Sequence, residues 1–175
     1  MTGDDVPAPA TPPGPEDSPG FMLWRATLRW QRTIAAALRP VALTHVQFVL
    51  LASVWWLSDQ ASSTHHLPSQ RALAAHAGVD VMMTSQVLRA LERRGLLART
   101  PDPTDARVKR LAVTQDGRRL AEQAISLVEE ADALFFDHVE SPAALLDLLR
   151  QLSRGPAVTA DRAGATPAPP SPAAL

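Results

Sequence analysis

The sequence contains no cysteine, and this absence excludes structural disulfides, thiolate metal sites and redox sensing through a thiol. A glycine-rich phosphate loop and a nucleophile elbow are also missing. His65, His66 and His76 form a weak metal pattern, because adjacent histidines do not easily bind one ion together and no carboxylate cluster lies nearby. We therefore expect a protein that is not an enzyme, with no catalytic residues, no cofactor and no metal ion.

The chain also lacks a long hydrophobic run. Its most apolar stretch, residues 46–57, is interrupted by Gln47 and Ser53 and is shorter than the ~20 residues that span a bilayer. The N-terminus is acidic and rich in proline, without the apolar segment of a signal peptide. These features predict a cytoplasmic protein that does not bind a membrane.

Charge is unevenly distributed along the chain, although the net charge is only −1. Residues 69–120 contain ten Lys and Arg against five Asp and Glu, whereas the remainder contains seven against thirteen. A basic block within an acidic chain is typical of a surface that binds phosphate groups. Residues 1–19 and 154–175 hold eleven of the sixteen prolines and show no periodicity, so we expect two disordered tails around a folded region over residues 20–153.

Residues 67–113 carry the signals of two short helices followed by a hairpin. Ser69 is a predicted N-cap of the first helix, and Gly78 ends it in the left-handed conformation. Asp80 is the predicted N-cap of the second helix, which Gly95 closes. The spacing therefore predicts a helix-turn-helix.

The second of these helices has two different faces. Thr84, Val87, Leu88 and Leu91 recur at helical spacing and predict a buried stripe. The opposite face carries long donors and a small hydroxyl: Met82, Ser85, Gln86, Arg89 and Arg93. Such a face suits contacts with base edges and phosphates in a major groove, and an ordinary solvated face is the alternative.

The hairpin is predicted from two short strands, residues 96–100 and 109–113, with a turn-rich loop between them. Arg107 near the loop tip suits insertion into a minor groove, where the negative potential is strongest. Asp105 either pairs with Arg107 and fixes its direction, or forms an Asx-turn in a merely solvated loop.

The string Asp102-Pro-Thr-Asp105-Ala-Arg107, followed by Leu111-Ala-Val-Thr114-Gln-Asp-Gly117, resembles the wing of the MarR family of bacterial transcriptional regulators. With the helix-turn-helix, the resemblance covers roughly residues 20–153. It implies a mainly α fold with a small β-hairpin, a winged helix-turn-helix flanked by N- and C-terminal dimerisation helices. It also implies a homodimer that binds a pseudo-palindromic operator in double-stranded DNA, most often as a repressor that a small-molecule effector releases.

The resemblance assigns DNA contacts to ten residues: Ser69, Gln70, Met82, Ser85, Gln86, Arg89, Arg93, Arg107, Lys109 and Arg110. In this assignment the first helix of the motif holds the DNA backbone, the second reads the major groove, and Arg107 enters the minor groove. Lys109 and Arg110 supply charge toward phosphates. Met82 departs from the family pattern, in which a small or polar residue is commoner, so it either contacts a thymine methyl group or only packs.

Residues 20–60 and 114–153 are predicted to form helices for dimerisation and effector binding. The C-terminal helices carry more leucine and phenylalanine than one winged helix can cover, which predicts an interface between two copies. Burial of this seam within a single subunit is the alternative.

The four tryptophans all fall within the first two predicted helices, where they belong either to the core or to a ligand pocket. We take Trp24, Trp30, His45 and Trp55 as the candidate pocket for an aromatic or phenolic effector, and a capping or interfacial histidine is the alternative for His45. A winged-helix module that binds proteins and does not read DNA is the alternative function. The local basic excess favours DNA.

Overall fold

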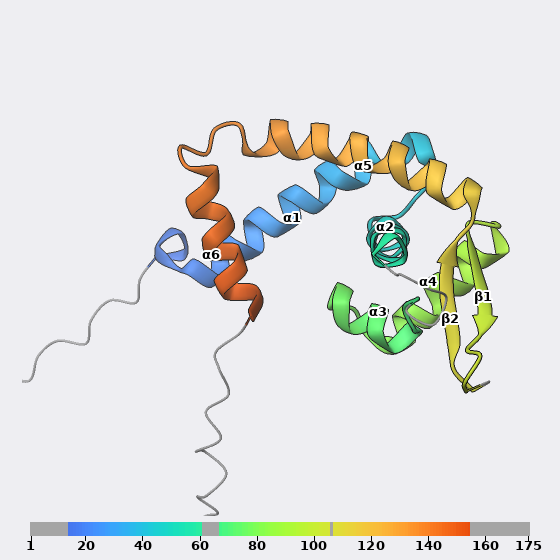
Figure 1. Cartoon of the computed structure of the whole chain (residues 1–175). Coiled ribbons are helices and arrows are strands. Elements are labelled where there is room, and N and C mark those ends of the chain that lie inside the picture. The colour runs from blue at the N-terminus through green and yellow to red at the C-terminus, as the bar shows by residue number, and fades with distance from the viewer. Residues whose placement is uncertain (1–13, 61–66, 106, 155–175) are drawn as a thin grey trace, which may run out of the picture. The chain divides into compact units, whose positions relative to one another are not determined.

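The computed structural model describes residues 14–60, 67–105 and 107–154. In chain order the elements are two short 3-10 helices, η1 (Pro15–Asp17) and η2 (Arg39–Val41), on either side of α1 (Pro19–Ala37), then α2 (His45–Asp59), α3 (Gln70–Ala77), α4 (Val81–Arg93), β1 (Leu97–Pro101), β2 (Lys109–Val113), α5 (Gln115–Phe136) and α6 (Pro142–Arg154) (Figure 1). The fold is thus mainly helical with one two-stranded hairpin, as the sequence predicts.

The described residues divide into two compact units, the first ending at Phe135 and the second beginning at Phe136. The sequence predicts a single folded region over residues 20–153. Residues 14–19 belong to the predicted N-terminal tail, yet they form η1 and the beginning of α1, whose N-cap is Ser18. The rest of that tail and residues 155–175 lie outside the described residues. Among the described ranges, no helix is both long and apolar enough to span a bilayer.

Helix α2 is the centre of the first unit (Figure 1). Thr44 and Gln47 form a capping box at its start, with hydrogen bonds of 3.0 and 3.2 Å. Leu50, Leu51 and Val54 are buried, and the helix packs against α1, α3, α4 and β2. This apolar helix therefore occupies the core of the unit.

The helix-turn-helix forms at the predicted residues. The Ser69 hydroxyl accepts a hydrogen bond from the Ala72 amide at 3.2 Å, and Gly78 ends α3 with a φ of 63°. The Asp80 carboxylate caps α4, and Gly95 follows that helix with a φ of 70°. Both glycines have the left-handed backbone that the sequence predicts at these two helix ends.

The hairpin pairs Leu97 with Val113 and Pro101 with Lys109 in antiparallel register. The second strand has the predicted bounds, and the first begins and ends one residue later than predicted. One isolated bridge, between Ser69 and Arg110, also joins the segment before α3 to β2. A single bridge has no periodicity, so the sequence gives no sign of it.

A tight junction connects the hairpin to α5. The Thr114 hydroxyl accepts from the Gly117 amide at 3.0 Å and donates to the Gly95 carbonyl at 2.7 Å. A Cβ atom at Gly117 would lie 1.9 Å from the carbonyl oxygen of Leu96. Only glycine fits this close approach of α5 to the start of the hairpin.

In the second unit, the Ser141 hydroxyl accepts from the Ala144 amide at 3.4 Å, and Pro142 is the first residue of α6. No residue of α6 is buried. Four of its leucines are exposed: Leu146, Leu148, Leu149 and Leu152. This helix therefore has an apolar face without a partner among the described residues of its own unit.

Candidate nucleic-acid interface

Helix α4 turns a narrow stripe of four exposed side chains outward: Met82, Gln86, Arg89 and Arg93. Their spacing of three or four residues places them on one helix face. The opposite stripe of Thr84, Leu88 and Leu91 is buried, and α4 packs on α2. Ser85 is half-buried at the border of the two faces. Three of the four residues of the predicted stripe are therefore buried and Val87 is half-buried, and the exposed side chains predicted to read bases point away from the core.

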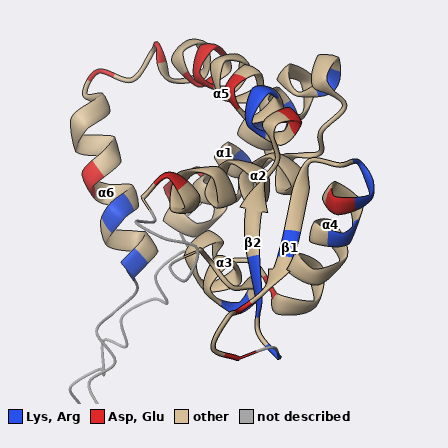
Figure 2. Ribbon diagram, turned by 45° about the vertical axis from the view of Figure 1, so that its right-hand side comes forward, with Lys and Arg blue, Asp and Glu red and all other residues tan. Residues whose placement is uncertain are grey.

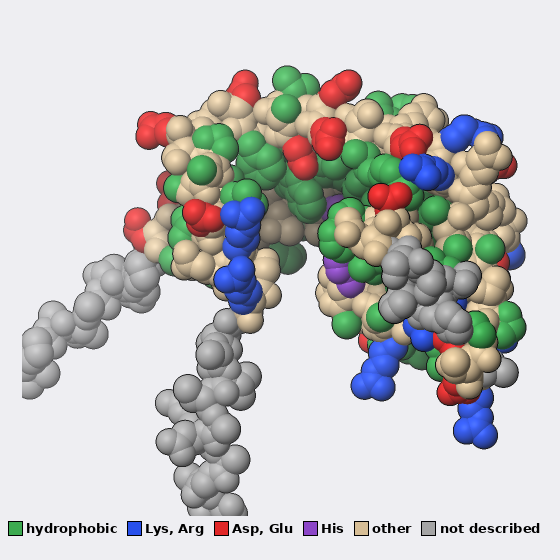
Figure 3. All heavy atoms as spheres, in the orientation of Figure 1, with side chains coloured by type: hydrophobic (Ala, Val, Ile, Leu, Met, Phe, Trp, Pro, Cys, Tyr) green, Lys and Arg blue, Asp and Glu red, His purple; other side chains and the backbone are tan. Residues whose placement is uncertain are grey.

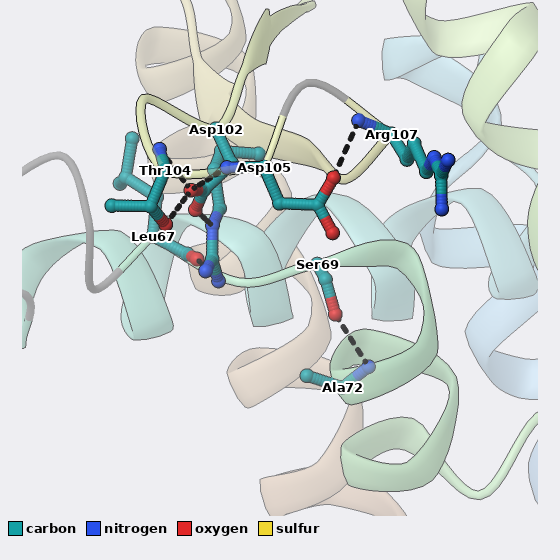
Figure 4. A network of polar contacts seen from close by, with 8 residues as sticks. Leu67, Ser69, Ala72, Asp102, Thr104, Asp105 and Arg107 are labelled. Carbon is teal, nitrogen blue, oxygen red and sulfur yellow. Dashed lines mark hydrogen bonds and ion pairs between the residues drawn. The ribbon is translucent and has the colours of Figure 1, made fainter.

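The tip of the wing consists of Asp105, Arg107 and Lys109. The Asp105 carboxylate accepts a hydrogen bond from the backbone N–H of Arg107 at 3.0 Å, so Asp105 forms the Asx-turn that the sequence left open (Figure 4). The guanidinium group of Arg107 extends away from this carboxylate (Figure 4). Arg107 and Lys109 are both exposed. Asp105 thus shapes the loop backbone and leaves the charge of Arg107 available.

The neck of the wing consists of Asp102, Thr104, Arg110 and the carbonyl of Leu67. The buried Asp102 carboxylate accepts from the Thr104 amide at 2.8 Å and from the Thr104 hydroxyl at 2.6 Å, and it forms an ion pair with the Nε of Arg110. Arg110 also donates to the Leu67 carbonyl at 3.0 Å. The neck therefore ties the loop to the segment that precedes α3 (Figure 4).

Asp102 is held in its charged form. The hydrogen bonds from Thr104, followed by that from Arg110, hold the pKa of Asp102 well below its usual range and outweigh the opposing effect of burial. The contact of Arg110 with a DNA phosphate stays a prediction. Its guanidinium group already binds two partners within the fold, this carboxylate and the carbonyl of Leu67.

Arginines with and without an acidic partner occur both inside and outside the interface; Arg29, Arg32, Arg39 and Arg154, which lie elsewhere, also form no ion pair among the described residues. Arg25, Arg99, Arg110, Arg118, Arg119 and Arg150 each form an ion pair with Asp or Glu. Within residues 14–60, 67–105 and 107–154, no carboxylate lies within ion-pair distance of Arg89, Arg93, Arg107 or Lys109. Basic residues occur on α4 and at the hairpin tip (Figure 2), and basic side chains project below α3 and below the hairpin (Figure 3). This charge is available for phosphate groups.

The predicted DNA-backbone contacts at the start of α3 are already engaged in hydrogen bonds within the protein. The Ser69 hydroxyl caps α3, and the side-chain amide nitrogen of Gln70 (Nε2) donates to the Val81 carbonyl at 3.5 Å. Arg71, which is not among the ten predicted DNA contacts, is exposed next to them and has no acidic partner among the described residues. Its position in the basic block is the signal that could have selected it.

The four predicted pocket residues do not lie at one site. Trp30 and His45 contact each other edge to face, with ring centroids 4.9 Å apart. The Trp30 indole donates to Asp132 of α5 at 2.7 Å. Burial lowers the pKa of His45, and the nearby charge of Asp132 opposes this shift only in part. Trp30, His45 and Asp132 therefore form a polar aromatic cluster, with a histidine that favours its neutral form.

Trp55 and Trp24 are not part of this cluster. Trp55 follows His45 by ten residues on α2, or ~15 Å along the helix axis, and its ring contacts the Arg118 guanidinium at 5.7 Å. Trp24 is exposed on α1. His76, from the weak metal pattern, stacks on Trp56 with centroids 5.5 Å apart, while His65 and His66 lie outside the described residues. In the described ranges no three His, Asp or Glu side chains are grouped as metal ligands.

Two helices joined at Gly78, an outward face on the second helix and a two-stranded wing with an exposed arginine define a winged helix-turn-helix. The MarR family model matches residues 43–109. YdcH of Bacillus subtilis (strain 168), an uncharacterized HTH-type transcriptional regulator, is 40% identical over 123 residues, which cover 70% of this chain and 81% of YdcH. The chain belongs to the MarR family, whose members are transcriptional regulators and not enzymes.

Solved structures of two regulators are similar to this chain. CouR from Rhodococcus jostii RHA1 bound to p-coumaroyl-CoA is 29% identical with a TM-score of 0.67, covering 81% of this chain and 92% of CouR. The transcriptional repressor CouR bound to a 23-mer DNA duplex has a TM-score of 0.66 at 29% identity, covering 79% and 92%. BpsR of Bordetella bronchiseptica, whose DNA binding is regulated by 6-hydroxynicotinic acid, has a TM-score of 0.70 at 29% identity, covering 82% and 98%.

Proposed function

We propose that this protein is a homodimeric transcriptional repressor that reads a pseudo-palindromic operator and releases it when an aromatic effector binds. The observation that carries the proposal is the set of basic side chains on α4 and the wing tip that lack acidic partners among the described residues. Leaving like charges unpaired on one surface is unfavourable unless a polyanion neutralises them. The DNA complex of the repressor CouR supports DNA as that polyanion.

In this proposal α4 enters the major groove. Gln86 and Arg89 have the donors that recognise adenine and guanine edges, and Arg93 is close enough to the helix end to meet a phosphate. Arg107 enters the neighbouring minor groove, and Lys109 contacts a phosphate. In a dimer the two α4 helices are then about 34 Å apart, one turn of DNA.

Exposed apolar side chains support the homodimer. Phe21, Met22 and Trp24 near the start of α1 are exposed, as are the leucines of α6. A monomer in water rarely exposes apolar side chains in such numbers, so a second copy of the chain is their proposed partner. The double variant Leu148→Ser and Leu152→Ser is expected to shift the molecular mass measured by light scattering toward that of a monomer.

The cluster of Trp30, His45 and Asp132 is the proposed contact for the effector. A neutral His45 has one donor and one acceptor nitrogen, which suits a phenolic hydroxyl group. p-Coumaroyl-CoA and 6-hydroxynicotinic acid, the compounds associated with CouR and BpsR, both contain a hydroxylated aromatic ring. This chemistry supports an aromatic effector that carries a hydroxyl group.

A contact at the end of the recognition helix supports coupling between this cluster and DNA. Arg94, which directly follows α4, donates a hydrogen bond to the Ala42 carbonyl at 2.9 Å. Ala42 lies three residues before His45 and has a φ of 50°, which is uncommon for a residue other than glycine. An effector that moves the start of α2 therefore acts on the position of α4, and differential binding to the two arrangements provides the regulation.

Binding to DNA flanking the gene tests the proposed function. The purified protein is titrated into this DNA and into a scrambled duplex at several salt concentrations. Tight binding that outcompetes the scramble and weakens steeply with salt is expected of a protein that reads sequence and neutralises phosphates. Equal, weak binding to both duplexes would favour the protein-interaction module instead.

The effector is tested on the same complex. 6-Hydroxynicotinic acid and p-coumaroyl-CoA are the first probes, followed by other hydroxylated aromatic acids and thioesters. One of them is expected to release the DNA from the parent protein and from His76→Phe, the control, but not from His45→Phe. Release from His45→Phe at the parent's concentration would remove His45 from the effector site.

A further inference from the structure

We propose that Met82 recognises the C5-methyl group of a thymine in each operator half-site, and that this contact sets sequence specificity at one base pair. The inference rests on the proposed function, because it requires α4 to lie in a major groove. The sequence left open whether Met82 contacts a thymine or only packs, and the structure bears on this choice.

Met82 does not pack against the protein. Its exposed fraction is 68%, compared with 47% for the neighbouring Met83. Met82 precedes Gln86 by one helical turn, so it lies at the N-terminal end of the stripe that continues through Arg89 and Arg93. If Gln86 and Arg89 reach base edges, the side chain one turn before them reaches the groove floor or its wall.

The N-cap of α4 favours a position of the Met82 side chain at the base edges on the floor of the major groove. The Asp80 carboxylate accepts from the amides of Met82 at 2.8 Å and Met83 at 3.1 Å. These N–H groups are therefore not free to hold a phosphate, and the negative charge of Asp80 repels one. Because the first turn of α4 offers the DNA backbone no attraction, its apolar side chain is expected to face base edges.

The backbone that carries Met82 is also fixed. The Thr84 hydroxyl donates to the Asp80 carbonyl at 2.8 Å, and the side-chain Nε2 of Gln70 donates to the Val81 carbonyl at 3.5 Å. The first turn of α4 is thus held from both sides, and only the Met82 side chain adapts to its target. Methionine is unbranched and polarizable, so it adjusts easily to a small apolar group.

Thymine offers that group. Its methyl is the apolar feature among the major-groove edges, whereas cytosine, guanine and adenine present donors and acceptors that an apolar side chain leaves unpaired. Met82 therefore favours thymine in two ways, through burial of the methyl group and through the loss of hydrogen bonds to water at any other base.

Deoxyuridine substitution tests the contact, because it removes only the methyl group. The operator is first selected from randomised duplexes with the parent protein, and each thymine is then replaced in turn by deoxyuridine. At one position per half-site we expect about fourfold weaker binding, or ~16-fold when both half-sites are changed, from the loss of one buried methyl group each.

Two variants identify the side chain responsible. Met82→Ala is expected to bind the unmodified operator more weakly and to show no further loss on deoxyuridine at that position. Met83→Ala, the matched control beside it, is expected to keep the full dependence on the methyl group. Circular dichroism checks that both variants are folded.

The outcomes separate this inference from the function on which it rests. A selected operator whose deoxyuridine variants bind like the parent duplex, or weaken Met82→Ala as much as the parent protein, overturns the role of Met82 and leaves DNA reading intact. A selection that yields no preferred sequence overturns the proposed function, and the role of Met82 with it.

Discussion

The neck and the tip of the wing contain similar residues and use them in different ways. In the neck, Asp102 and Arg110 satisfy each other's charge, and Arg110 also holds the Leu67 carbonyl. At the tip, Asp105 bonds to the backbone of Arg107 and leaves the guanidinium exposed. Charge satisfied within the fold contributes to stability, while charge left exposed is available for a ligand. Variants of the inner contacts should therefore affect folding and DNA binding together, and variants of the tip should affect DNA binding alone.

The largest effect is expected at the junction that supports the wing from within. Gly117→Ala would bring a Cβ atom within 1.9 Å of the Leu96 carbonyl, and backbone atoms cannot move aside easily. We expect urea unfolding to show a loss of about 3 kcal/mol or more, with DNA binding lost in parallel. Gly20→Ala is the control, because a Cβ there meets nothing within 4 Å. Equal unfolding midpoints for the two variants would contradict this close contact.

The neck is tested next by Asp102→Asn, which should lower both stability and operator affinity at neutral pH. Because the folded pKa of Asp102 lies below its unfolded value, the carboxylate stabilises the fold fully above the unfolded value, and this contribution is lost as pH falls through the folded pKa. The gap in unfolding free energy between parent and variant is therefore expected to narrow below about pH 4.

The exposed Asp116, which forms an ion pair with Arg119 on the surface, provides the matched control for this pH dependence. Asp116→Asn should differ little from the parent at any pH, since exposed ion pairs contribute little. A gap for Asp102→Asn that stays constant down to acidic pH would show that the neck does not depend on the charge of Asp102.

At the tip, Arg107→Ala is expected to weaken operator binding by about 1–3 kcal/mol if Arg107 contacts base edges in the minor groove. The unfolding midpoint should not change, because the side chain is exposed and has no acidic partner among the described residues. Arg119→Ala, which removes an exposed but paired arginine, is the control and should bind operator almost as the parent does. Parent-like affinity for Arg107→Ala would show that the wing tip does not contact DNA.

The smallest effect is expected from Lys109→Ala. A phosphate contact has no sequence preference, so this variant should bind operator and scrambled DNA more weakly by the same factor. The slope of log affinity against log salt should become shallower by about one unit. A loss confined to the operator would identify Lys109 as a base contact instead.

Local signals explain which parts of the fold were predictable. Ser69, Gly78, Asp80 and Gly95 mark helix ends through their own backbone and side-chain chemistry, and all four are found at the predicted ends. The buried stripe of α4 and the bounds of β2 follow in the same way from periodicity. Such features depend on neighbours within a few residues of the sequence.

The parts that were not predictable depend on distant neighbours. Asp132 is 102 positions from Trp30, and no local pattern connects them. Arg107 and Arg110 look equally basic in the sequence, and only the fold shows that Asp102 neutralises the second. The candidate pocket residues were predicted to lie together on the first two helices, yet their partners come from α5: Asp132 binds Trp30, and Arg118 contacts the ring of Trp55.

The hydrogen bonds of the wing loop have a consequence for the entropy of DNA binding. The amides of Thr104, Asp105 and Arg107 are each bound by an aspartate of the same loop, at 2.8, 3.1 and 3.0 Å. Ordering three such residues on contact with DNA would oppose binding by roughly 3–6 kcal/mol. Folding has already ordered these three residues, so a wing that enters the minor groove as proposed would do so with this part of its backbone preorganised.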